Sequence, residues 1–142
     1  MVNSVQIVEA LKAVVEDGKV RTDEESLNYH GKAWTKIYAK KPTAIVFPKT
    51  TEEVQAFVSL ANAMGFAFVS SGGRTGLSAG AVATNGEVVV SFDYMNAVLD
   101  FSASDQTVRC QAGIVTEQLQ NFAEENGLYY PVDFASAGSS QI

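Results

Sequence analysis

The sequence of 142 residues predicts an α+β protein: a small parallel β-α-β subdomain, followed by an incomplete antiparallel-sheet subdomain with a helix. Two observations predict this class. Short apolar runs at 44–47 and 66–69 flank a stretch with helical periodicity, which is the order of a β-α-β unit. Further along, two strand-like runs surround the turn 102–105 and lead into a second helical stretch, as in an antiparallel hairpin followed by a helix.

Composition limits the classes of function. Apolar residues make up 46% of the chain, enough for the core of one domain or of two small halves. The net charge of −6 and the absence of a basic cluster predict that nucleic acid is not a partner. The lone Cys110 excludes an internal disulfide and favours a reducing, cytoplasmic location. We expect no signal peptide, no membrane span and no metal site.

The first 40 residues predict a helix and an overlying loop. Apolar residues recur at helical spacing over about 5–17, with Ser4 as the expected N-cap and Gly18 as the stop. The polar segment 21–41 has no clear period, and we expect an ordered loop over the body. His30 in this loop has no evident partner in the sequence, which predicts a surface histidine.

The next segment predicts the β-α-β unit. A strand over 42–48 is bounded by proline at each end. A helix is expected to begin at Thr50 or Thr51 and to end at Gly65, and a strand over 66–70 follows. We expect the two strands to be parallel and the crossover to be right-handed.

A glycine-rich loop follows this second strand. From Ser70 to Gly80 it holds four glycines, four hydroxyl side chains and one cation. Glycines let consecutive backbone N–H groups converge on an anion such as a diphosphate. The loop does not match the dinucleotide fingerprint or the P-loop, because no helix clearly starts after Gly76 and Leu77 replaces the P-loop lysine. By itself it indicates either a phosphate site or a tight surface turn.

The rest of the chain predicts further strands and one helix, separated by turn residues. We expect strands over about 87–92, 97–101, 106–111 and 128–134. The helix is expected to begin with Thr116 as N-cap and to end before Gly127. The small, polar segment 135–140 suits either close approach to a ligand or a disordered tail. No element closes the sheet after the last strand, which predicts an incomplete domain.

Four motifs occur in a fixed order along the chain. They are Lys41–Pro48 with Thr51-Glu52-Glu53-Val54; Ser71–Ser78; Val108–Gly113 before a helix; and Gly127-Leu128 with Pro131, Asp133 and Ser136. In this combination, residues 41–142 resemble the N-terminal part of the FAD-binding domain of the vanillyl-alcohol oxidase (p-cresol methylhydroxylase) family. Within that family the glycolate oxidase and D-lactate dehydrogenase branch is the most similar.

The resemblance implies a set of FAD-binding residues. The FAD diphosphate would be held by Ser71, Gly72, Gly73, Arg74, Thr75, Gly76, Leu77 and Ser78. Pro48 would lie near the adenine end. The flavin side would be approached by Pro131, Asp133 and the segment with Ala137, Gly138, Ser139 and Ile142. Some relatives attach flavin through a histidine at the place of Arg74, so the resemblance implies a non-covalent cofactor here.

The resemblance also implies an organisation and an activity. Residues 41–95 would form the first FAD-binding subdomain with the diphosphate loop, and 96–142 the truncated start of the second, preceded by the helix and overlying loop expected for 1–40. The complete protein would be an oxidoreductase that transfers a hydride from a small 2-hydroxy acid, such as glycolate or D-lactate, to FAD. No general base is assigned. Because the chain ends before a substrate site, we expect the fragment alone to be inactive and to retain FAD weakly or not at all. Another nucleotide-binding module, or an interaction module without redox activity, is the alternative.

Overall fold

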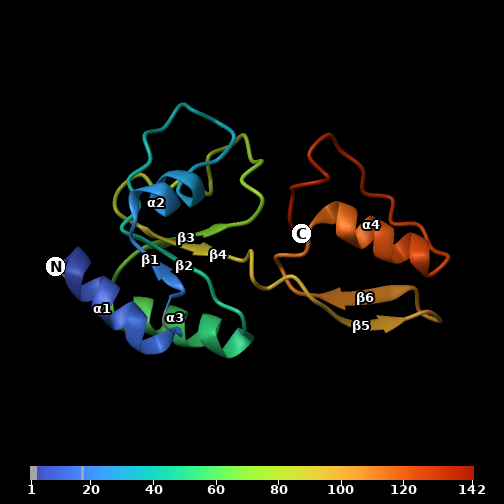
Figure 1. Ribbon diagram of the computed structural model, residues 1–142, viewed down its shortest axis with the longest axis horizontal. Helices are drawn as coiled ribbons and strands as arrows, with labels where there is room; N and C mark the ends of the chain where they lie inside the picture. The colour runs from blue at the N-terminus through green and yellow to red at the C-terminus, as the bar shows by residue number, and fades with distance from the viewer. Residues whose placement is uncertain (1–2, 17) are drawn as a thin grey trace.

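The protein, seen in a computed structural model that describes residues 3–16 and 18–142, has two bodies joined by one extended connection (Figure 1). The N-terminal body contains α1 (Ser4–Val14), β1 (Val20–Arg21), α2 (Glu24–His30), β2 (Ala44–Val46), α3 (Thr51–Met64), β3 (Phe68–Ser71) and β4 (Val88–Ser91). The C-terminal body contains β5 (Val98–Ser102), β6 (Thr107–Cys110) and α4 (Thr116–Glu125). The predicted α+β class is confirmed.

The N-terminal body is built on a four-stranded sheet with the order β1-β2-β4-β3. Strands β2 and β3 both run parallel to β4, so the predicted β-α-β unit is parallel, with β4 inserted between its strands. Strand β1 pairs antiparallel with β2 at one edge. Because β2, β3 and β4 point the same way, their carboxyl ends share one edge of the sheet.

Helices cover both faces of this sheet (Figure 1). Val46 packs in one cluster with Leu11 of α1 and Phe57 of α3, and Leu11, Val46 and Phe57 are fully buried. The neighbouring Ile45 belongs to the cluster on the other face, against Leu27 of α2. Burial on both faces explains why β2 and β4 are apolar at successive positions instead of alternating.

The helix ends follow local capping chemistry. Thr50 caps α3, since its hydroxyl accepts a hydrogen bond from the Glu53 N–H at 3.2 Å, and Gly65 ends the helix with a φ of 70°. The N-cap of α1 is Asn3 and not Ser4, because the Asn3 side chain accepts from the Gln6 N–H at 2.9 Å. Helix α1 ends at Val14, earlier than predicted, and position 17 lies outside the described residues.

The predicted loop over 21–41 contains a short helix, α2, so that prediction was wrong for residues 24–30. Asp23 caps it by accepting from the Ser26 N–H at 2.9 Å, and Glu24 and Glu25 lie in its first turn. The helix has seven residues, and Leu27 is the aliphatic side chain that it packs against the sheet. A single apolar contact leaves no hydrophobic period in the sequence, which is why the helix was missed.

In the C-terminal body, β5 and β6 form the predicted antiparallel hairpin. The N-cap of α4 is Val115, one residue before the predicted Thr116. The predicted strand over 128–134 was wrong: the structure has no strand there, and Pro131 lacks the N–H that a sheet ladder needs. The segment after it is ordered by backbone hydrogen bonds, such as Ser140 N–H to the Ser136 carbonyl at 2.8 Å, so it is not a disordered tail.

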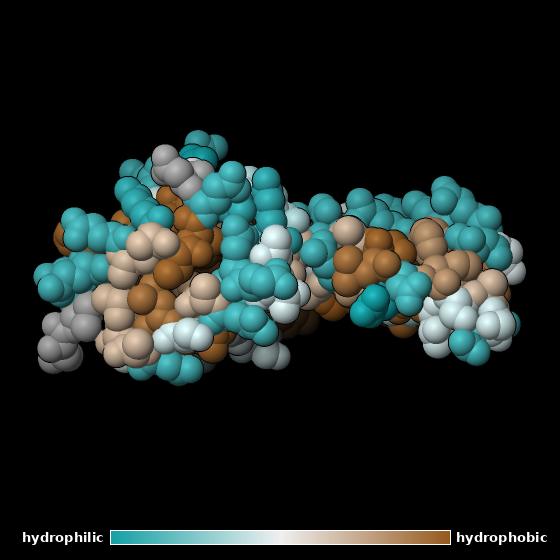
Figure 2. Space-filling model, turned by 90° about the horizontal axis from the view of Figure 1, so that it is seen from below, coloured by the Kyte–Doolittle hydropathy of each residue, from teal (hydrophilic) through white to brown (hydrophobic). Residues whose placement is uncertain are grey.

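Helix α4 covers one face of the β5–β6 hairpin (Figure 1). The opposite face carries exposed hydrophobic surface in the view from below (Figure 2), and Leu99 of β5 is 53% exposed. None of the helices that the structure describes combines the length and hydrophobicity needed to cross a membrane.

Candidate functional site

The glycine-rich loop begins where β3 ends, at the carboxyl edge of the parallel strands, where open α/β sheets bind ligands. In the part of the chain that the structure describes, no backbone N–H from Gly72 to Ser78 donates a hydrogen bond. Arg74 and Ala79 adopt left-handed conformations, with φ of 59° and 61°. Successive free amides around a left-handed residue form a concavity that binds anions. The loop can therefore receive a diphosphate.

The C-terminal segment 134–142 lies directly against this loop. A Cβ atom at Gly73 would overlap the carbonyl group of Ser139, so only glycine allows this approach. Thr75 Oγ1 and Ser140 Oγ are 2.9 Å apart and share a hydrogen bond. The two sequence regions that were predicted to bind FAD are thus neighbours in space, although more than 60 residues separate Thr75 from Ser140.

The first turn of α4 holds the C-terminal segment in place. The backbone N–H of Thr116 donates to the carbonyl of Ser140 at 2.8 Å, and that of Glu117 donates to the carbonyl of Ala137 at 3.1 Å. The buried Thr116 hydroxyl adds a second hydrogen bond to the Ser140 carbonyl, at 3.1 Å. These bonds satisfy N–H groups that the start of a helix leaves without partners. They explain why a small, polar segment is ordered.

A cavity of about 680 Å³ opens between the loop and the C-terminal segment. Three segments line it: 29–34, 73–77 and 134–139. Its size lies within the range that is usual for ligand sites. The first of these segments, with Tyr29, Lys32 and Trp34, was predicted only as an overlying loop, and its place at the cavity had no signal in the sequence.

The Arg74 side chain is mostly buried, with 12% of it exposed. Its Nη1 atom donates to the Gly72 carbonyl at 2.9 Å and lies 3.3 Å from a carboxylate oxygen of Asp93. The same atom is 3.3 Å from His30 Nδ1, and the guanidinium lies over the Tyr29 ring at 4.7 Å. The predicted charge of the loop is therefore present, but the guanidinium bonds to the Gly72 carbonyl of the loop itself and to Asp93 and His30 beside it.

His30 is not the isolated surface residue that was expected. Its side chain is 13% exposed, and Nδ1 lies 3.6 Å from the Asp93 carboxylate. Burial lowers the pKa of His30 from its usual range, and the positive charge of Arg74 lowers that pKa further. The imidazole is thus held neutral near pH 7, and its Nδ1 can accept a hydrogen bond from Arg74.

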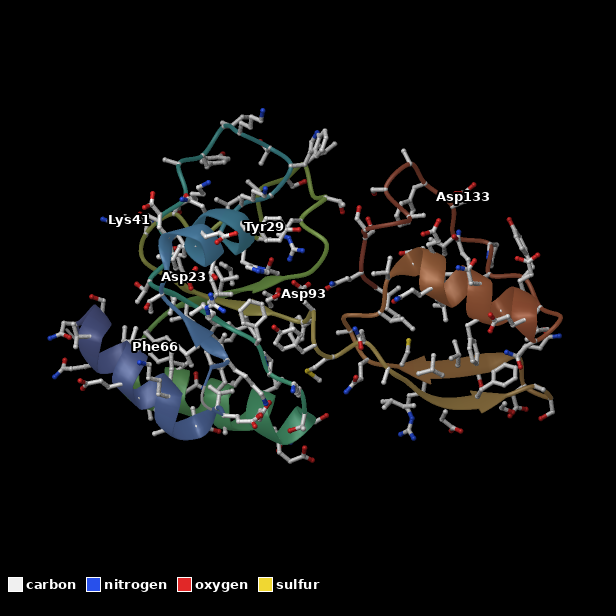
Figure 3. The ribbon with its side chains drawn as sticks, viewed as in Figure 1. Asp23, Tyr29, Lys41, Phe66, Asp93 and Asp133 are labelled. Carbon is white, nitrogen blue, oxygen red and sulfur yellow. The ribbon has the colours of Figure 1, made fainter. Side chains whose placement is uncertain are left out.

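The structure brings some of the predicted residues together and leaves others apart. The loop from Ser71 to Ser78 and the segment from Ala137 to Ile142 adjoin each other as described above. Pro48 is fully buried just after β2, at the same edge of the sheet. Asp133 borders a different cavity, beside α4 (Figure 3), and Pro131 is exposed.

Two residues that the sequence did not single out, Asp93 and Ser91, lie beside the loop and the C-terminal segment. Asp93 comes just after β4, and its Oδ1 accepts from Gln141 Nε2 at 2.7 Å. Three buried polar atoms have no hydrogen-bond partner among the described residues: Ser71 Oγ, Ser91 Oγ and Gln141 Oε1. Ser71 and Ser91 are paired in register on β3 and β4. Buried polar groups without partners are uncommon, and here they adjoin the free amides of the loop. The free amides of the loop and the two serine hydroxyls are donors and fit an anionic cofactor, whereas Gln141 Oε1 can only accept.

Comparison with known proteins gives the context for this site. The family model described as an FAD binding domain matches residues 42–142. D-2-hydroxyglutarate dehydrogenase from Stutzerimonas stutzeri (strain A1501) is 66% identical over 136 residues, which are 96% of this chain and 29% of that protein. The chain thus spans less than a third of the length of this curated relative.

Solved structures share the fold. Alkyldihydroxyacetonephosphate synthase superposes with a TM-score of 0.86 at 22% identity, over 96% of this chain and 30% of that one. p-Cresol methylhydroxylase with substrate bound superposes with a TM-score of 0.71 at 18% identity, over 95% and 27% of the two chains. These likenesses confirm the fold that the four motifs implied. Since the family model covers more than half of its length, the chain belongs to the family of FAD-binding domains.

Proposed function

We propose that this chain is the FAD-binding part of a flavin-dependent dehydrogenase that oxidises a small 2-hydroxy acid. The observation that carries the proposal is the row of free backbone N–H groups from Gly72 to Ser78, which borders a cavity opposite the C-terminal segment. The name of the Stutzerimonas relative supports D-2-hydroxyglutarate as the substrate, alongside the glycolate and D-lactate that the motifs suggested. A dicarboxylate substrate is therefore the first to test.

In this proposal the amides from Ser71 to Ser78 bind the two phosphates, and Arg74 adds positive charge. Pro48 lies toward the adenine. The flavin side is formed by residues of the C-terminal segment: Ala137, Gly138, Ser139 and Ile142. When bound, FAD accepts the hydride of the substrate. The residues of this chain bind and orient the cofactor, and we assign none of them as a general base. Pro131 and Asp133 stay candidates for the flavin side.

The division of the chain into 1–40, 41–95 and 96–142 is also our proposal, supported by the change from one sheet to another after β4.

A cytoplasmic location is proposed because Cys110 is the lone cysteine of the chain. The names of relatives from Arabidopsis thaliana and Bos taurus include the word mitochondrial, so location needs its own experiment. Fractionation of cells that express the full-length protein will show in which compartment the protein resides.

The test of the diphosphate site compares two glycine variants in the full-length protein. A Cβ atom added at Gly76 or at Gly80 meets no atom within 4 Å, so both variants should fold. We expect Gly76→Val to remove bound FAD, because the new side chain stands among the phosphate-binding amides. Gly80→Val, outside the proposed amides, should retain FAD. The measurement is the FAD released per mole of purified protein.

Competition separates the diphosphate from the flavin ring. ADP carries the diphosphate and should displace FAD, whereas riboflavin lacks it and should not bind detectably. Reduction of bound FAD by D-2-hydroxyglutarate, D-lactate and glycolate, followed by absorbance, will identify the substrate. A full-length protein that takes up no flavin, or a Gly76→Val variant that binds FAD like wild type, would overturn the proposal.

A further inference from the structure

Asp93 connects the two segments that face each other across the cavity, although it belongs to neither. It lies directly after β4, in the chain that leads from the N-terminal to the C-terminal body (Figure 3). Its Oδ1 accepts from Gln141 Nε2 at 2.7 Å, and its Oδ2 is 3.3 Å from Arg74 Nη1. One carboxylate thus contacts the glycine-rich loop on one side and the C-terminal segment on the other.

The surroundings of Asp93 make these contacts selective for a carboxylate. The side chains of Arg74 and Asp93 are 12% and 23% exposed, so water screens their attraction only in part. Both neighbours present N–H donors, and a carboxylate offers two oxygens that only accept. An amide at this position would turn an NH₂ group toward one of the donors and lose that hydrogen bond.

The partners of Asp93 are themselves placed at the loop. Arg74 also donates to the carbonyl of Gly72, and this bond spans the start of the free amides. Gln141 lies against Gly72, where an added Cβ would be 3.3 Å from Gln141 Oε1. Loss of either contact would free the loop or the C-terminal segment to move relative to the other. The amides would then need to be ordered by the ligand at a cost in affinity.

We propose that Asp93 is a positioning residue for FAD: it holds Arg74 and Gln141 together, and so keeps the diphosphate loop and the C-terminal segment in register before the cofactor arrives. The proposal rests on the FAD site proposed above. It adds a residue that acts on FAD affinity through its two neighbours.

The experiment measures FAD affinity and apoprotein stability of the full-length protein in parallel. Asp93→Asn should raise the Kd for FAD about tenfold, the effect of losing one charge-assisted hydrogen bond. Ala61→Gly is the control for stability alone, because this buried residue in α3 lies in the helix–sheet core. This control should lower the unfolding midpoint and leave the Kd for FAD within about twofold of the wild-type value. Asp100→Asn, at an exposed position of β5, should change neither.

A double-mutant cycle tests the route of the effect. Gln141→Leu removes the second partner and should also raise the Kd. The variant with both Asp93→Asn and Gln141→Leu should then bind FAD better than the product of the single effects predicts, because the two residues share one interaction.

Each outcome has one meaning. If wild type binds no FAD, the proposed function fails and Asp93 has no cofactor to position. If wild type binds FAD but Asp93→Asn binds equally well, the positioning role is wrong. The same holds if Ala61→Gly weakens FAD binding as much as Asp93→Asn does, or if the effects of the double-mutant cycle multiply without coupling.

Discussion

The two bodies of the protein differ in how much of their apolar surface they bury. The N-terminal body has a sheet covered on both faces, and Leu11, Ile45, Phe57 and Val88 in its core are inaccessible to solvent. The hairpin of the C-terminal body is covered on one face only, and hydrophobic surface is exposed on the other (Figure 2). Leu99 of β5 is 53% exposed. A sheet with one bare face gains less from the hydrophobic effect, so we infer that most of the stability resides in the N-terminal body.

The contacts between the bodies are of a different kind again. They are mainly polar or made by glycine: Gly73 against Ser139, Thr75 with Ser140, Asp93 with Gln141, and Gly113 against the carbonyls of Phe92 and Met95. Such contacts contribute geometry more than hydrophobic stabilisation. The candidate site therefore lies at the polar junction between the bodies, which contributes less stability than the apolar core of the N-terminal body beside it. Four predictions test this contrast, in order of decreasing expected effect.

The core prediction concerns Phe57, which is fully buried between α3 and the sheet. Phe57→Ala should lower the free energy of unfolding by about 3–5 kcal/mol, through lost burial and the cavity left behind. Phe122→Ala, on the partly exposed side of α4 against Phe101, should cost only about 1–2 kcal/mol. Chemical denaturation measures both. Equal losses would contradict the contrast between the bodies.

The junction prediction concerns Gly73. Gly73→Ala places a methyl group into the carbonyl of Ser139 and should cost about 1–3 kcal/mol. Because the C-terminal segment must move, the amides of Thr116 and Glu117 should lose protection from hydrogen exchange. Gly80→Ala is the control, since nothing lies within 4 Å of its added carbon. Unchanged exchange at Thr116 in Gly73→Ala would show that the close contact is absent in solution.

The capping prediction concerns the start of α3. Thr50→Ala removes the acceptor of the Glu53 N–H and should destabilise the protein by about 1 kcal/mol. Thr51→Ala, at the first helical position, removes no cap and should leave the thermal midpoint unchanged. A loss for Thr51→Ala as large as for Thr50→Ala would place the N-cap one residue later.

The smallest effect is expected for the change in stability with pH that arises from protonation of His30. Burial beside Arg74 lowers the pKa of His30 below the usual 6.5, so the unfolded chain binds this proton at a higher pH than the folded protein does. Stability should therefore fall as the pH drops through about 6.5. The His30→Asn variant keeps a hydrogen-bond acceptor for Arg74 but has no imidazole to titrate. Its stability should therefore decrease less over the same pH range. His30 is the only histidine, so its imidazole resonance reports the pKa directly. A resonance that titrates above pH 6.5 would contradict the burial.

Local patterns predicted most of the N-terminal body correctly. The proline-bounded strand, the Thr50 cap and the Gly65 stop are determined by neighbours in the sequence, and the structure contains all three features. Helix α2 and strand β1 were missed because each contributes only one or two residues to the packing of the sheet. So few residues produce no hydrophobic period in the sequence. The strand expected at 128–134 was apolar enough but has no strand to pair with, and pairing is a tertiary property.

By itself the sequence determined the fold class, the diphosphate loop as a candidate and the small-residue segment near its end. These depend on intervals between nearby residues and on which residues allow close backbone approach. Three features appear first in the folded protein: the segment around Ser140 lies on the loop, Tyr29 and Trp34 border the cavity, and Asp93 joins Arg74 to Gln141. These contacts depend on how the two bodies meet, which no local pattern specifies.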